Sequence, residues 1–544
     1  MRTTLIASTL AAALSAAPAN ADEPHWAADS VFYLAFVRSY ADSAQGPLAN
    51  DGVGDLRGMI ERLDYLNDGD PETDTDLGVT GLWLMPIAQS PSYHGYDTTD
   101  YEAVDDEYGT MDDLRELVDA CHARGIRVVL DLVLNHTADE HPWFVDSAQP
   151  GSGRRDWYIW RDPKPAYKGA WGQTVWHDHQ RERAGASYFG GFHHGMPDLN
   201  YETPAVTAEM QRIARFWIDE AGVDGFRLDA VKHLIEDGED QSSTDATIAW
   251  LRGFNGFCDS VRADAWLVGE VWSGPDEIAK YIGADLTTPA LDSCFDFPVA
   301  YAILEGIRDG DGARISAELA RSWELHRGRS SPFLSNHDTE RAMSVLGKDE
   351  RRARAAATLL LTAPGTPFIY YGEEIGMTGT KPDPNLRTPM QWTWHPVTRG
   401  FSTVRPWHPV QEDAASVNVE TERRDPISLW QHYRTLIAAR QDMPALRRGS
   451  FTPVDAGAAG AVAFVREQAT GTRRVLVIVN ATDDDINSYT IDAEQLGLAP
   501  GAAGRDVLSG AETAPVPAED PRAWRPFAAA LDPYESRVID LGTP

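Results

Sequence analysis

Residues 225–233 read GFRLDAVKH, a short apolar run that ends in charged and polar residues. Side chains alternate between the two faces of a strand, so Arg227 and Asp229 project to the same side at the end of this run. Apolar runs with few interruptions are typical of parallel strands that are buried on both faces. This stretch therefore predicts a buried parallel strand with charged groups at its carboxyl end.

The same pattern occurs at seven other places, and amphipathic stretches separate several of them. The other apolar runs are residues 31–37, 81–87, 127–134, 266–272, 291–298, 332–335 and 367–371. The amphipathic stretches, at residues 111–124, 204–221 and 248–262, suit crossover helices between parallel strands. Strands that alternate with helices in this way predict an α/β fold, a (β/α)₈ barrel built from residues 22–136 and 197–446.

Two segments depart from this alternation. Residues 137–196 are rich in aromatic residues, Gly and His, which predicts an irregular inserted domain after the third strand rather than a disordered linker. Residues 447–544 contain short alternating strands and a Pro-rich stretch, which predict a C-terminal all-β sandwich domain. We expect this domain to cover one side of the barrel. Starch binding, which needs a pair of exposed aromatic rings, is the alternative.

The first residues are typical of a secretory signal peptide. Arg2 precedes a mostly apolar stretch that reaches Pro18, and Ala19-Asn20-Ala21 follows as a cleavage site. We therefore expect residues 1–21 to be removed near Ala21 and the protein to be secreted or periplasmic; a buried N-terminal helix is the alternative. No later stretch has the roughly 20 apolar residues of a membrane span.

The composition limits the classes of partner. The 544 residues include 48 basic and 83 acidic side chains, a formal net charge of −35. This negative field argues against nucleic acid and anionic membranes and favours a neutral or cationic substrate. Cys121, Cys258 and Cys294 are too few for a disulfide framework, and we interpret them as small buried apolar residues. No pattern in the sequence indicates an oligomeric state.

Acidic and basic side chains gather at the ends of four predicted strands. The runs end near Asp229, Glu270, Asp338 and His136. Catalytic groups of (β/α)₈ barrels lie at the carboxyl ends of the strands, where these side chains would meet. Because desolvating several carboxylates together is costly, such a cluster favours a functional site over an ion-paired layer that merely closes the barrel. An Asp and a Glu without metal-ligand spacing suit glycoside cleavage, in which one carboxyl attacks and the other donates a proton.

Four short strings, in their order along the chain, and a fifth string between the first two resemble the signature regions of the α-amylase family of glycoside hydrolases, family thirteen. The fifth, MPDLN, has the form typical of members intermediate between oligo-1,6-glucosidases and neopullulanases. The strings are residues 131–136, 225–233, 270–272, 333–338 and 196–200. Further matches at residues 94–97, 370–374 and 387–392 extend the resemblance from about residue 31 to residue 446. The resemblance implies the barrel, the inserted domain and an enzymatic function.

The resemblance also implies a role for each matching residue. Asp229 would be the nucleophile, Glu270 the general acid/base and Asp338 the third carboxylate, which holds and distorts the sugar. Lys232 and His233 resemble a pair on the leaving-group side, although solvated residues at a helix start are the alternative. The remaining residues would orient the nucleophile or hold the glucose whose bond is cut: Arg227, Tyr96, Asp97, His136, His337 and Arg387.

The loop at residues 42–55, DSAQGPLANDGVGD, predicts a Ca²⁺ site. Oxygen ligands around glycines suit Ca²⁺, whereas the acidic groups and the lack of Lys argue against a phosphate loop. By resemblance to the family's calcium loop the ligands would be Asp51, the Val53 carbonyl and Asp55, and less directly Asp42 and Asn50. An Asx-rich turn is the alternative. The resemblance further implies a second calcium site at Asn135 and the His233 carbonyl, with an unidentified ligand from the inserted domain.

These features predict a retaining hydrolase of the α-amylase type, which cleaves α-1,4-glucosidic bonds of starch and maltooligosaccharides through a covalent glucosyl-enzyme intermediate. The pair Lys232 and His233 favours α-amylase. The strings at residues 196–200 and 387–392 favour an exo-acting α-glucosidase or oligo-1,6-glucosidase, and transglycosylation would use the same intermediate. A non-catalytic binding protein on the same fold is a further reading, but all three carboxylates are present.

Overall fold

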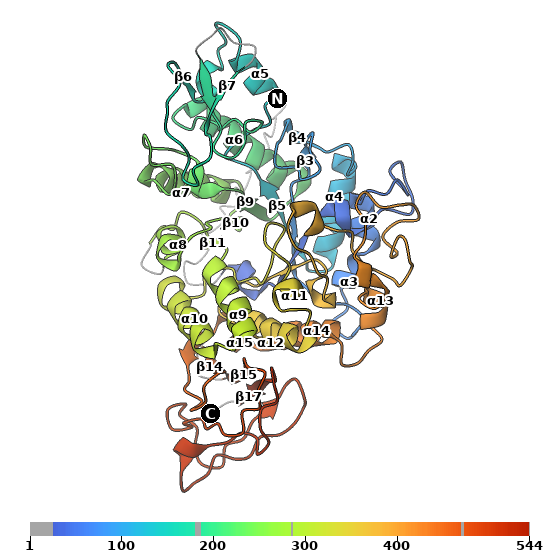
Figure 1. Ribbon diagram of the computed structural model, residues 1–544, viewed down its shortest axis with the longest axis vertical. Coiled ribbons are helices and arrows are strands. Elements are labelled where there is room, and N and C mark those ends of the chain that lie inside the picture. The colour runs from blue at the N-terminus through green and yellow to red at the C-terminus, as the bar shows by residue number, and fades with distance from the viewer. Residues whose placement is uncertain (1–24, 180–185, 284–286, 469–472, 543–544) are drawn as a thin grey trace, which may run out of the picture.

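The computed structural model describes residues 25–179, 186–283, 287–468 and 473–542, so the predicted signal peptide lies outside the described residues. Its centre is a curled parallel sheet with the strand order β11-β10-β9-β5-β2-β1-β12 (Figure 1). The strands are β1 (Phe32–Ala35), β2 (Gly81–Leu84), β5 (Arg127–Leu132), β9 (Gly225–Leu228), β10 (Trp266–Gly269), β11 (Ser293–Cys294) and β12 (Phe368–Tyr370). Each lies within a predicted apolar run.

The predicted run at residues 332–335 closes the sheet into a barrel. Phe295, just after β11, bridges to Ser331, and Phe333 bridges to Phe368 of β12, both in parallel orientation. This eighth strand forms single bridges instead of a ladder. It is short, and the loop that contains Asp338 follows it directly. The bridges complete the ring, and the predicted (β/α)₈ barrel is confirmed.

Large aromatic rings fill the barrel at the amino ends of the strands. Phe32 stacks between Phe368, at 4.6 Å between ring centroids, and Trp266, at 5.1 Å. Gly81 provides the space for this stack, because a Cβ at that position would lie 2.6 Å from the Phe32 ring. The barrel therefore has a closed floor, and polar groups reach its interior from the opposite end.

Helices surround the sheet, and sequence signals explain where the predicted ones begin. Thr110 and Asp113 form a capping box at the start of α4, and Pro204 opens α6. The predicted helices at residues 111–124, 204–221 and 248–262 correspond to α4, to α6 with the π-helical turn Trp217–Ala221, and to α7. The longer helices are α4 (Met111–Ala123), α6 (Pro204–Phe216), α7 (Asp245–Val261), α8 (Pro275–Ile282), α9 (Phe297–Asp309), α10 (Gly312–His326), α12 (Glu350–Thr362) and α14 (Leu429–Asp442). The short ones are α1 (Val37–Tyr40), α2 (Leu56–Glu61), α3 (Leu63–Leu66), α5 (Pro142–Ser147), α11 (Ala342–Val345), α13 (Val419–Glu422) and α15 (Pro444–Arg448).

The segment after β5 leaves the barrel and forms a small sheet of its own. Its strands β6 (Trp160–Arg161), β8 (Ser187–Phe189) and β7 (Trp176–Asp178) pair antiparallel in that order. Phe144 of α5 packs against Trp160 and Tyr188, so aromatic residues form the core of this segment. A two-stranded ladder of β3 (Ala88–Gln89) and β4 (Asp100–Val104) lies between β2 and α4 in the chain. In Figure 1 β6 and β7 lie at the end of the molecule opposite the C-terminal sheet.

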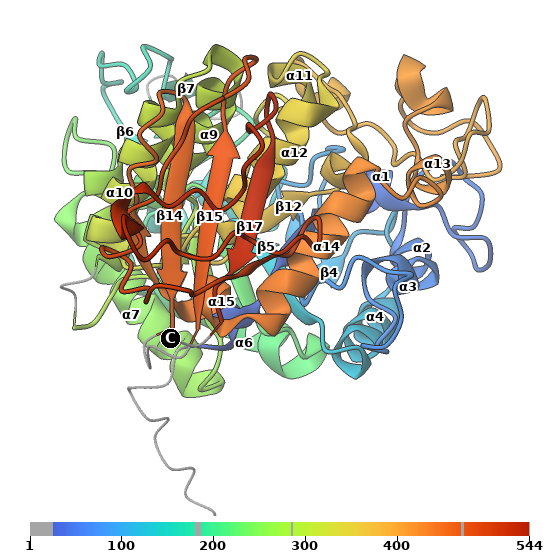
Figure 2. The same ribbon diagram turned by 90° about the horizontal axis from the view of Figure 1, so that it is seen from below.

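The C-terminal residues form an antiparallel sheet that packs on barrel helices. Its strand order is β13-β14-β15-β17-β16, and β14 and β15 lie against α10 and α12 (Figure 2). The other layer is irregular chain, in which Ile486 bridges to Leu531 and Ile491 to Trp524. Of the aromatic residues here, Trp524 is 1 % exposed and Tyr534 4 %, which favours the covering role over a starch platform. The strands are β13 (Ser450–Pro453), β14 (Ala461–Glu467), β15 (Arg474–Asn480), β16 (Arg505–Asp506) and β17 (Ser536–Asp540).

Two buried arginines join the barrel to this sheet at the end of α12. Arg440 of α14 donates to the carbonyls of Leu361, Ala363 and Gly365. Arg466 of β14 donates to the carbonyl of Thr362 at 2.7 Å and also to those of Ser450 and Gly449. The last carbonyls of a helix have no partner within the helix, so these guanidinium groups satisfy them.

Two other features of the chain agree with expectation. All three cysteines are buried and free. Among the residues that the structure describes, no helix has both the length and the apolar character to cross a bilayer.

Candidate active site

Strand ends bring the predicted catalytic groups together around one buried arginine. Arg227, near the end of β9, is 1 % exposed. Its Nη1 donates to Asp229 at 2.7 Å and to Asp131 at 2.9 Å, and its Nη2 donates to Glu270 at 2.8 Å. Strand pairing explains the arrangement, since Asp131 is the register partner of Arg227 and Glu270 directly follows β10. One cation therefore holds three carboxylates at the mouth of the barrel.

Asp338 lies in a second part of the same network. One of its carboxylate oxygens is 3.0 Å from Nε2 of His337, and the other accepts from Arg387 at 2.9 Å. The hydroxyl of Tyr96 lies 2.6 Å from the same His337 nitrogen and donates to Asp131 at 3.0 Å. Tyr96 thereby connects the Asp338 group to the carboxylates around Arg227.

The surroundings of these carboxyl groups separate their pKa values. Burial raises the pKa of Glu270 to about 7 against the opposing effect of Arg227, and the charge of Asp229 adds to the rise. Burial also raises the pKa of Asp229, to about 6, with Arg227 again opposing. Burial alone would raise the pKa of Asp338, but His337 and Arg387 outweigh it and hold that pKa below its usual range. Glu270 can therefore keep a proton while Asp229 and Asp338 are ionised.

The carboxylates of Asp229, Glu270 and Asp338 line a cavity of about 600 Å³. Predicted site residues make up a large part of its wall: Tyr96, His136, Asp229, Lys232, His233, Glu270, Asp338 and Arg387. His136 presents one ring nitrogen to the Tyr96 carbonyl at 3.1 Å, and Lys232 donates to the Trp272 carbonyl at 3.0 Å. Arg227 and His337 lie behind the wall and act on the cavity through the residues that they bond.

Asp97 is not among the residues that line the cavity, and its predicted contact with the glucose stays a prediction. Its carboxylate accepts from the hydroxyls of Ser90, at 2.7 Å, and Ser92. It also lies 3.8 Å from Nδ1 of His94, and His94 lines the cavity in its place. Gly95, with φ of 80°, forms a turn between His94 and Tyr96, and both of these residues line the cavity.

Several residues of the site were missed by the sequence reasoning. Asp131 stands in a quoted motif, and alternation along its strand was a usable signal, because it faces the same way as Arg227 on the neighbouring strand. Trp272 ends the predicted run at residues 266–272, and His94 and Met196 stand in quoted motifs, but none of the three was singled out. The other missed residues line the cavity without a strand-end signal: Trp171, Phe192 and Asp383.

The carboxylates of the predicted calcium loop serve the loop's own backbone. Asp42 accepts from the N–H groups of Asn50 at 2.8 Å and Gly52 at 2.9 Å, and Asp51 accepts from Val53. Asp55 caps α2, accepting from Gly58 at 2.8 Å, and it also accepts from the Ser43 N–H. In the described part of the chain no three His, Cys, Asp or Glu side chains gather as metal ligands. This donor arrangement fits the Asx-rich turn, and calcium in this loop stays a prediction.

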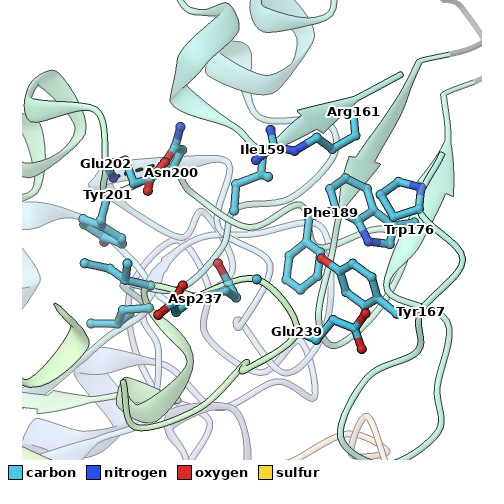
Figure 3. A pocket seen from close by; sticks show the side chains of 15 residues that line it. Ile159, Arg161, Tyr167, Trp176, Phe189, Asn200, Tyr201, Glu202, Asp237 and Glu239 are labelled. Carbon is cyan, nitrogen blue, oxygen red and sulfur yellow. Dashed lines mark hydrogen bonds between the residues drawn. The ribbon is translucent and has the colours of Figure 1, made fainter. Parts of the chain in front are cut away.

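The second calcium site has a more suitable set of groups. The Asn135 amide lies 2.6 Å from the His233 carbonyl, and the fully buried Asp198 has one carboxylate oxygen without a hydrogen-bond partner. Burial raises the pKa of Asp198, and the nearby Glu236 carboxylate raises it further. Glu236 also borders a cavity of about 340 Å³ between the inserted segment and residues 234–239 (Figure 3). A buried carboxylate oxygen without a partner, close to other oxygen groups, is the kind of group that a divalent cation binds, and the second calcium site stays a prediction.

A nucleophilic carboxylate and a protonated carboxyl held by one guanidinium at a barrel mouth define the site of a glycosidase. The comparisons with known proteins agree. The model of the alpha amylase catalytic domain matches residues 35–449, and the chain belongs to the α-amylase family. Alpha-amylase 3 of Dictyoglomus thermophilum is 38 % identical over 79 % of this chain and 80 % of its own length. Glucan 1,6-alpha-glucosidase of Streptococcus pneumoniae is 31 % identical over 90 % of this chain and 98 % of its own length. The crystal structure of alpha-amylase from H. orenii superposes with a TM-score of 0.80 at 35 % identity, covering 95 % of this chain and all of that one.

Proposed function

We propose that the protein hydrolyses α-1,4-glucosidic bonds of starch and maltooligosaccharides with retention of configuration. The observation that carries this proposal is the single Arg227 guanidinium that bonds both Asp229, at 2.7 Å, and Glu270, at 2.8 Å. Retaining enzymes need their two carboxyl groups only about 5 Å apart, and a shared guanidinium keeps them close. The relative called Alpha-amylase 3 supports the choice of bond.

The geometry assigns one step to each group. Glu270 donates its proton to the glycosidic oxygen while Asp229 attacks the anomeric carbon, so the C–O bond to the leaving chain breaks as a glucosyl–Asp229 ester forms. Glu270, now ionised, takes a proton from water, and the resulting hydroxide displaces Asp229 from the sugar. The ionised Asp338, held by His337 and Arg387, stabilises positive charge on the sugar ring.

A second candidate is exo-acting hydrolysis or transfer on short oligosaccharides. It is supported by the names of other relatives. Oligo-1,6-glucosidase of Parageobacillus thermoglucosidasius is 32 % identical over 78 % of this chain, and trehalose synthase of Thermus thermophilus is 34 % identical over 84 % of it. The chain spans half of the latter protein. Both activities would use the same glucosyl ester and differ in the acceptor.

Products formed from maltoheptaose and soluble starch over a short time course test these two functions. Mixed short oligosaccharides at the earliest times are the expected result. Release of glucose alone, with starch left intact, would establish the exo-acting alternative. If well-folded wild type were as inactive as Asp229→Asn on both substrates, no glycosidase function would remain.

We also propose that calcium binds at Asn135, Asp198 and the His233 carbonyl as a structural ion, and that the protein is exported after cleavage near Ala21. Support for calcium is the partnerless oxygen of Asp198. Added Ca²⁺ should raise the melting temperature of chelator-treated wild type but not of Asp198→Asn. An equal rise in both proteins would refute this site. N-terminal sequencing of protein recovered from culture medium or periplasm tests the cleavage.

A further inference from the structure

Two adjacent glutamates are buried near the loop of residues 336–341, the Asp338 loop, and have no role in the steps above. Glu373 and Glu374 follow β12 in the 3₁₀-helical turn Glu373–Ile375, and they are 6 % and 0 % exposed. Neither is among the described residues that line the catalytic cavity. Removing a carboxyl group from water is costly, so the partners of each group indicate what it does.

Glu373 joins the chain that leads to Asp338 to helix α14. One of its oxygens accepts from the Ser335 hydroxyl at 2.8 Å, and the other accepts from the hydroxyl of Tyr433 in α14 at 3.0 Å. Ser335 and Tyr433 are both buried, and Ser335 lies three residues before Asp338. The carboxyl group of Glu373 thus connects the start of the Asp338 loop to a helix that packs on the barrel.

The Asp338 loop begins with a turn that is held by its own hydrogen bonds. The side-chain oxygen of Asn336 accepts from the N–H groups of Asp338 at 2.9 Å and Thr339 at 3.0 Å. The N–H of Asn336 donates to the Thr339 hydroxyl at 3.0 Å. Because these bonds make the turn a unit, a shift of the chain at Ser335 would move the Asp338 carboxylate with it. The preceding residues 331–333 pair with their neighbours through single bridges, so a side-chain contact at Ser335 adds a connection where the backbone provides few.

The surroundings of Glu373 favour its protonated form. Burial raises the pKa of Glu373 to about 8, and the charge of the neighbouring Glu374 adds to the rise. The hydrogen bonds from Ser335 and Tyr433 and the positive charge of Arg341 oppose the rise in this pKa. Glutamine has nearly the shape of a protonated glutamate, so Glu373→Gln should keep hydrogen bonds to both hydroxyls.

Glu374 provides an internal comparison. One of its oxygens accepts from the hydroxyl of Tyr33 in β1 at 2.9 Å and from that of Tyr65 in α3 at 2.6 Å. Both tyrosines are buried, and both lie far from the Asp338 loop in the sequence. The two glutamates therefore share burial and the type of partner, but of the two it is Glu373 that bonds the chain leading to Asp338.

We propose that Glu373 is a positioning residue, which through Ser335 fixes the place of the Asp338 carboxylate at the barrel mouth. The inference rests on the proposed glucosidic-bond hydrolysis and deepens it. In that mechanism Asp338 stabilises positive charge that develops on the sugar ring, so its placement affects the transition state more than the bound substrate. Loss of the connection between Glu373 and Ser335 lowers kcat and leaves KM nearly unchanged.

Kinetics of three variants on maltoheptaose test this role. Ser335→Ala and Glu373→Leu both remove the connection, and we expect kcat to fall about tenfold with KM within about twofold of wild type. Glu373→Gln should keep at least about half of the wild-type kcat, because the amide replaces the carboxyl group in both hydrogen bonds. A loss of kcat in Glu373→Gln equal to that in Glu373→Leu would contradict the proposed hydrogen-bonding role.

Tyr65→Phe is the matched control, because it also removes one buried hydroxyl from a buried glutamate, Glu374. Its kcat should stay within about twofold of wild type. Urea denaturation should show similar losses of stability for Tyr65→Phe and Ser335→Ala, so the difference in kcat between them would not come from stability. Active wild type with Ser335→Ala equal in kcat to Tyr65→Phe would overturn this inference and leave the proposed function intact.

A double-mutant cycle shows whether the effect passes through Asp338. With α-glucosyl fluoride, an activated substrate, Ser335→Ala should lower kcat about tenfold in the wild-type background but less than about twofold in Asp338→Asn. Equal factors in both backgrounds would overturn the inference, since they would indicate a general structural role for Ser335. Inactivity of well-folded wild type on both substrates would remove the proposed function, and this inference with it.

Discussion

The barrel mouth and the junction with the C-terminal sheet both bury arginine, but they compensate its charge differently. At the mouth, Arg227 is surrounded by Asp131, Asp229 and Glu270, which raise its pKa despite burial. At the junction, within the described residues, Arg440 and Arg466 ion-pair with no carboxylate and donate to backbone carbonyls. Burial lowers the pKa of Arg440 to about 9 and lowers that of Arg466 as well.

The difference shows that one residue type serves chemistry in one place and assembly in the other. Carboxylates around Arg227 can exchange protons, so their mutual field sets which of them is ionised. Peptide carbonyls do not titrate, and around Arg440 and Arg466 they provide fixed partners that join three chain segments. Removing a guanidinium should therefore abolish activity at the mouth and lower stability at the junction.

The largest expected effect is that of Arg227→Gln. Without the cation, three carboxylates lie close together with no positive charge between them. The pKa values of Glu270 and Asp229 are then no longer set so that Glu270 keeps its proton while Asp229 is ionised. We expect kcat on maltoheptaose to fall by about a thousandfold or more, with circular dichroism confirming a folded protein. Arg212→Gln is the control, because Arg212 also bonds two glutamates, Glu102 and Glu209, but with a half-exposed side chain. A comparable loss in the control would contradict the special position of Arg227.

Next is Arg466→Met, which removes hydrogen bonds to three carbonyls, of which those to Thr362 and Gly449 are buried. We expect the free energy of unfolding to fall by about 3 kcal/mol, measured by urea denaturation, while kcat/KM stays unchanged at low temperature. Arg351→Met, on an exposed residue of α12, should change stability by less than about 0.5 kcal/mol. Equal stability of the two variants would show that the junction does not depend on its buried charge.

The pH dependence sharpens the description of the mouth. Activity needs Asp229 ionised and Glu270 protonated, so kcat/KM should fall below about pH 6 as Asp229 takes a proton and above about pH 7 as Glu270 loses one. The charge of Asp131 raises the pKa of Asp229. Asp131→Asn should therefore move the acidic limb to lower pH, by up to about one unit. A shift of that limb to higher pH would contradict the assigned interaction.

The smallest effect is expected at Asp97, whose carboxylate accepts from the hydroxyls of Ser90 and Ser92. Asp97→Asn should keep kcat and KM for maltoheptaose within about threefold of wild type, because the carboxylate already accepts from two serine hydroxyls and is not among the groups that line the cavity. His94→Ala, at a residue that lines the cavity, should raise KM more strongly. Initial-rate kinetics of the two variants decide the order, and the reverse order would restore Asp97 as a sugar ligand.

The barrel and the gathering of carboxylates at its mouth could be predicted because strand alternation and the topology of parallel strands determine which residues share a face and an end of the barrel. Asp229 and Glu270 follow buried runs, and the carboxyl ends of parallel strands meet at one mouth. The positions of cavity residues on loops do not follow from strand alternation. The exposure of Trp171 and Trp272 depends on how the inserted segment and α9 fold over the mouth.

Partners that are not side chains also escaped prediction. The oxygens of the loop at residues 42–55 accept hydrogen bonds from its own N–H groups, so a sequence rich in Asp does not by itself show where its lone pairs point. Arg466 contacts carbonyls at the end of α12, distant in the chain, and carbonyls are present in every residue. In contrast, Asp198 stood in a recognised motif, but its position close to Asn135 was visible only in the folded chain.

The single bridges at Ser331 and Phe333 make residues 331–333 a strand of the barrel wall with few hydrogen-bonded pairs. On either side of it the strands pair over longer registers, as β2 does with β5. Strand segments with few ladder hydrogen bonds open locally more often than segments with many. The amide protons near residues 331–333 should therefore exchange with solvent earlier than those of β2. His337 and Asp338 lie in the loop that directly follows residues 331–333. Asp338 thus lies on the chain that leaves a strand joined by single bridges, whereas Asp229 follows β9, which pairs with β5 and with β10 over four residues each. The two predicted catalytic carboxylates therefore stand on parts of the barrel wall that are held to different degrees.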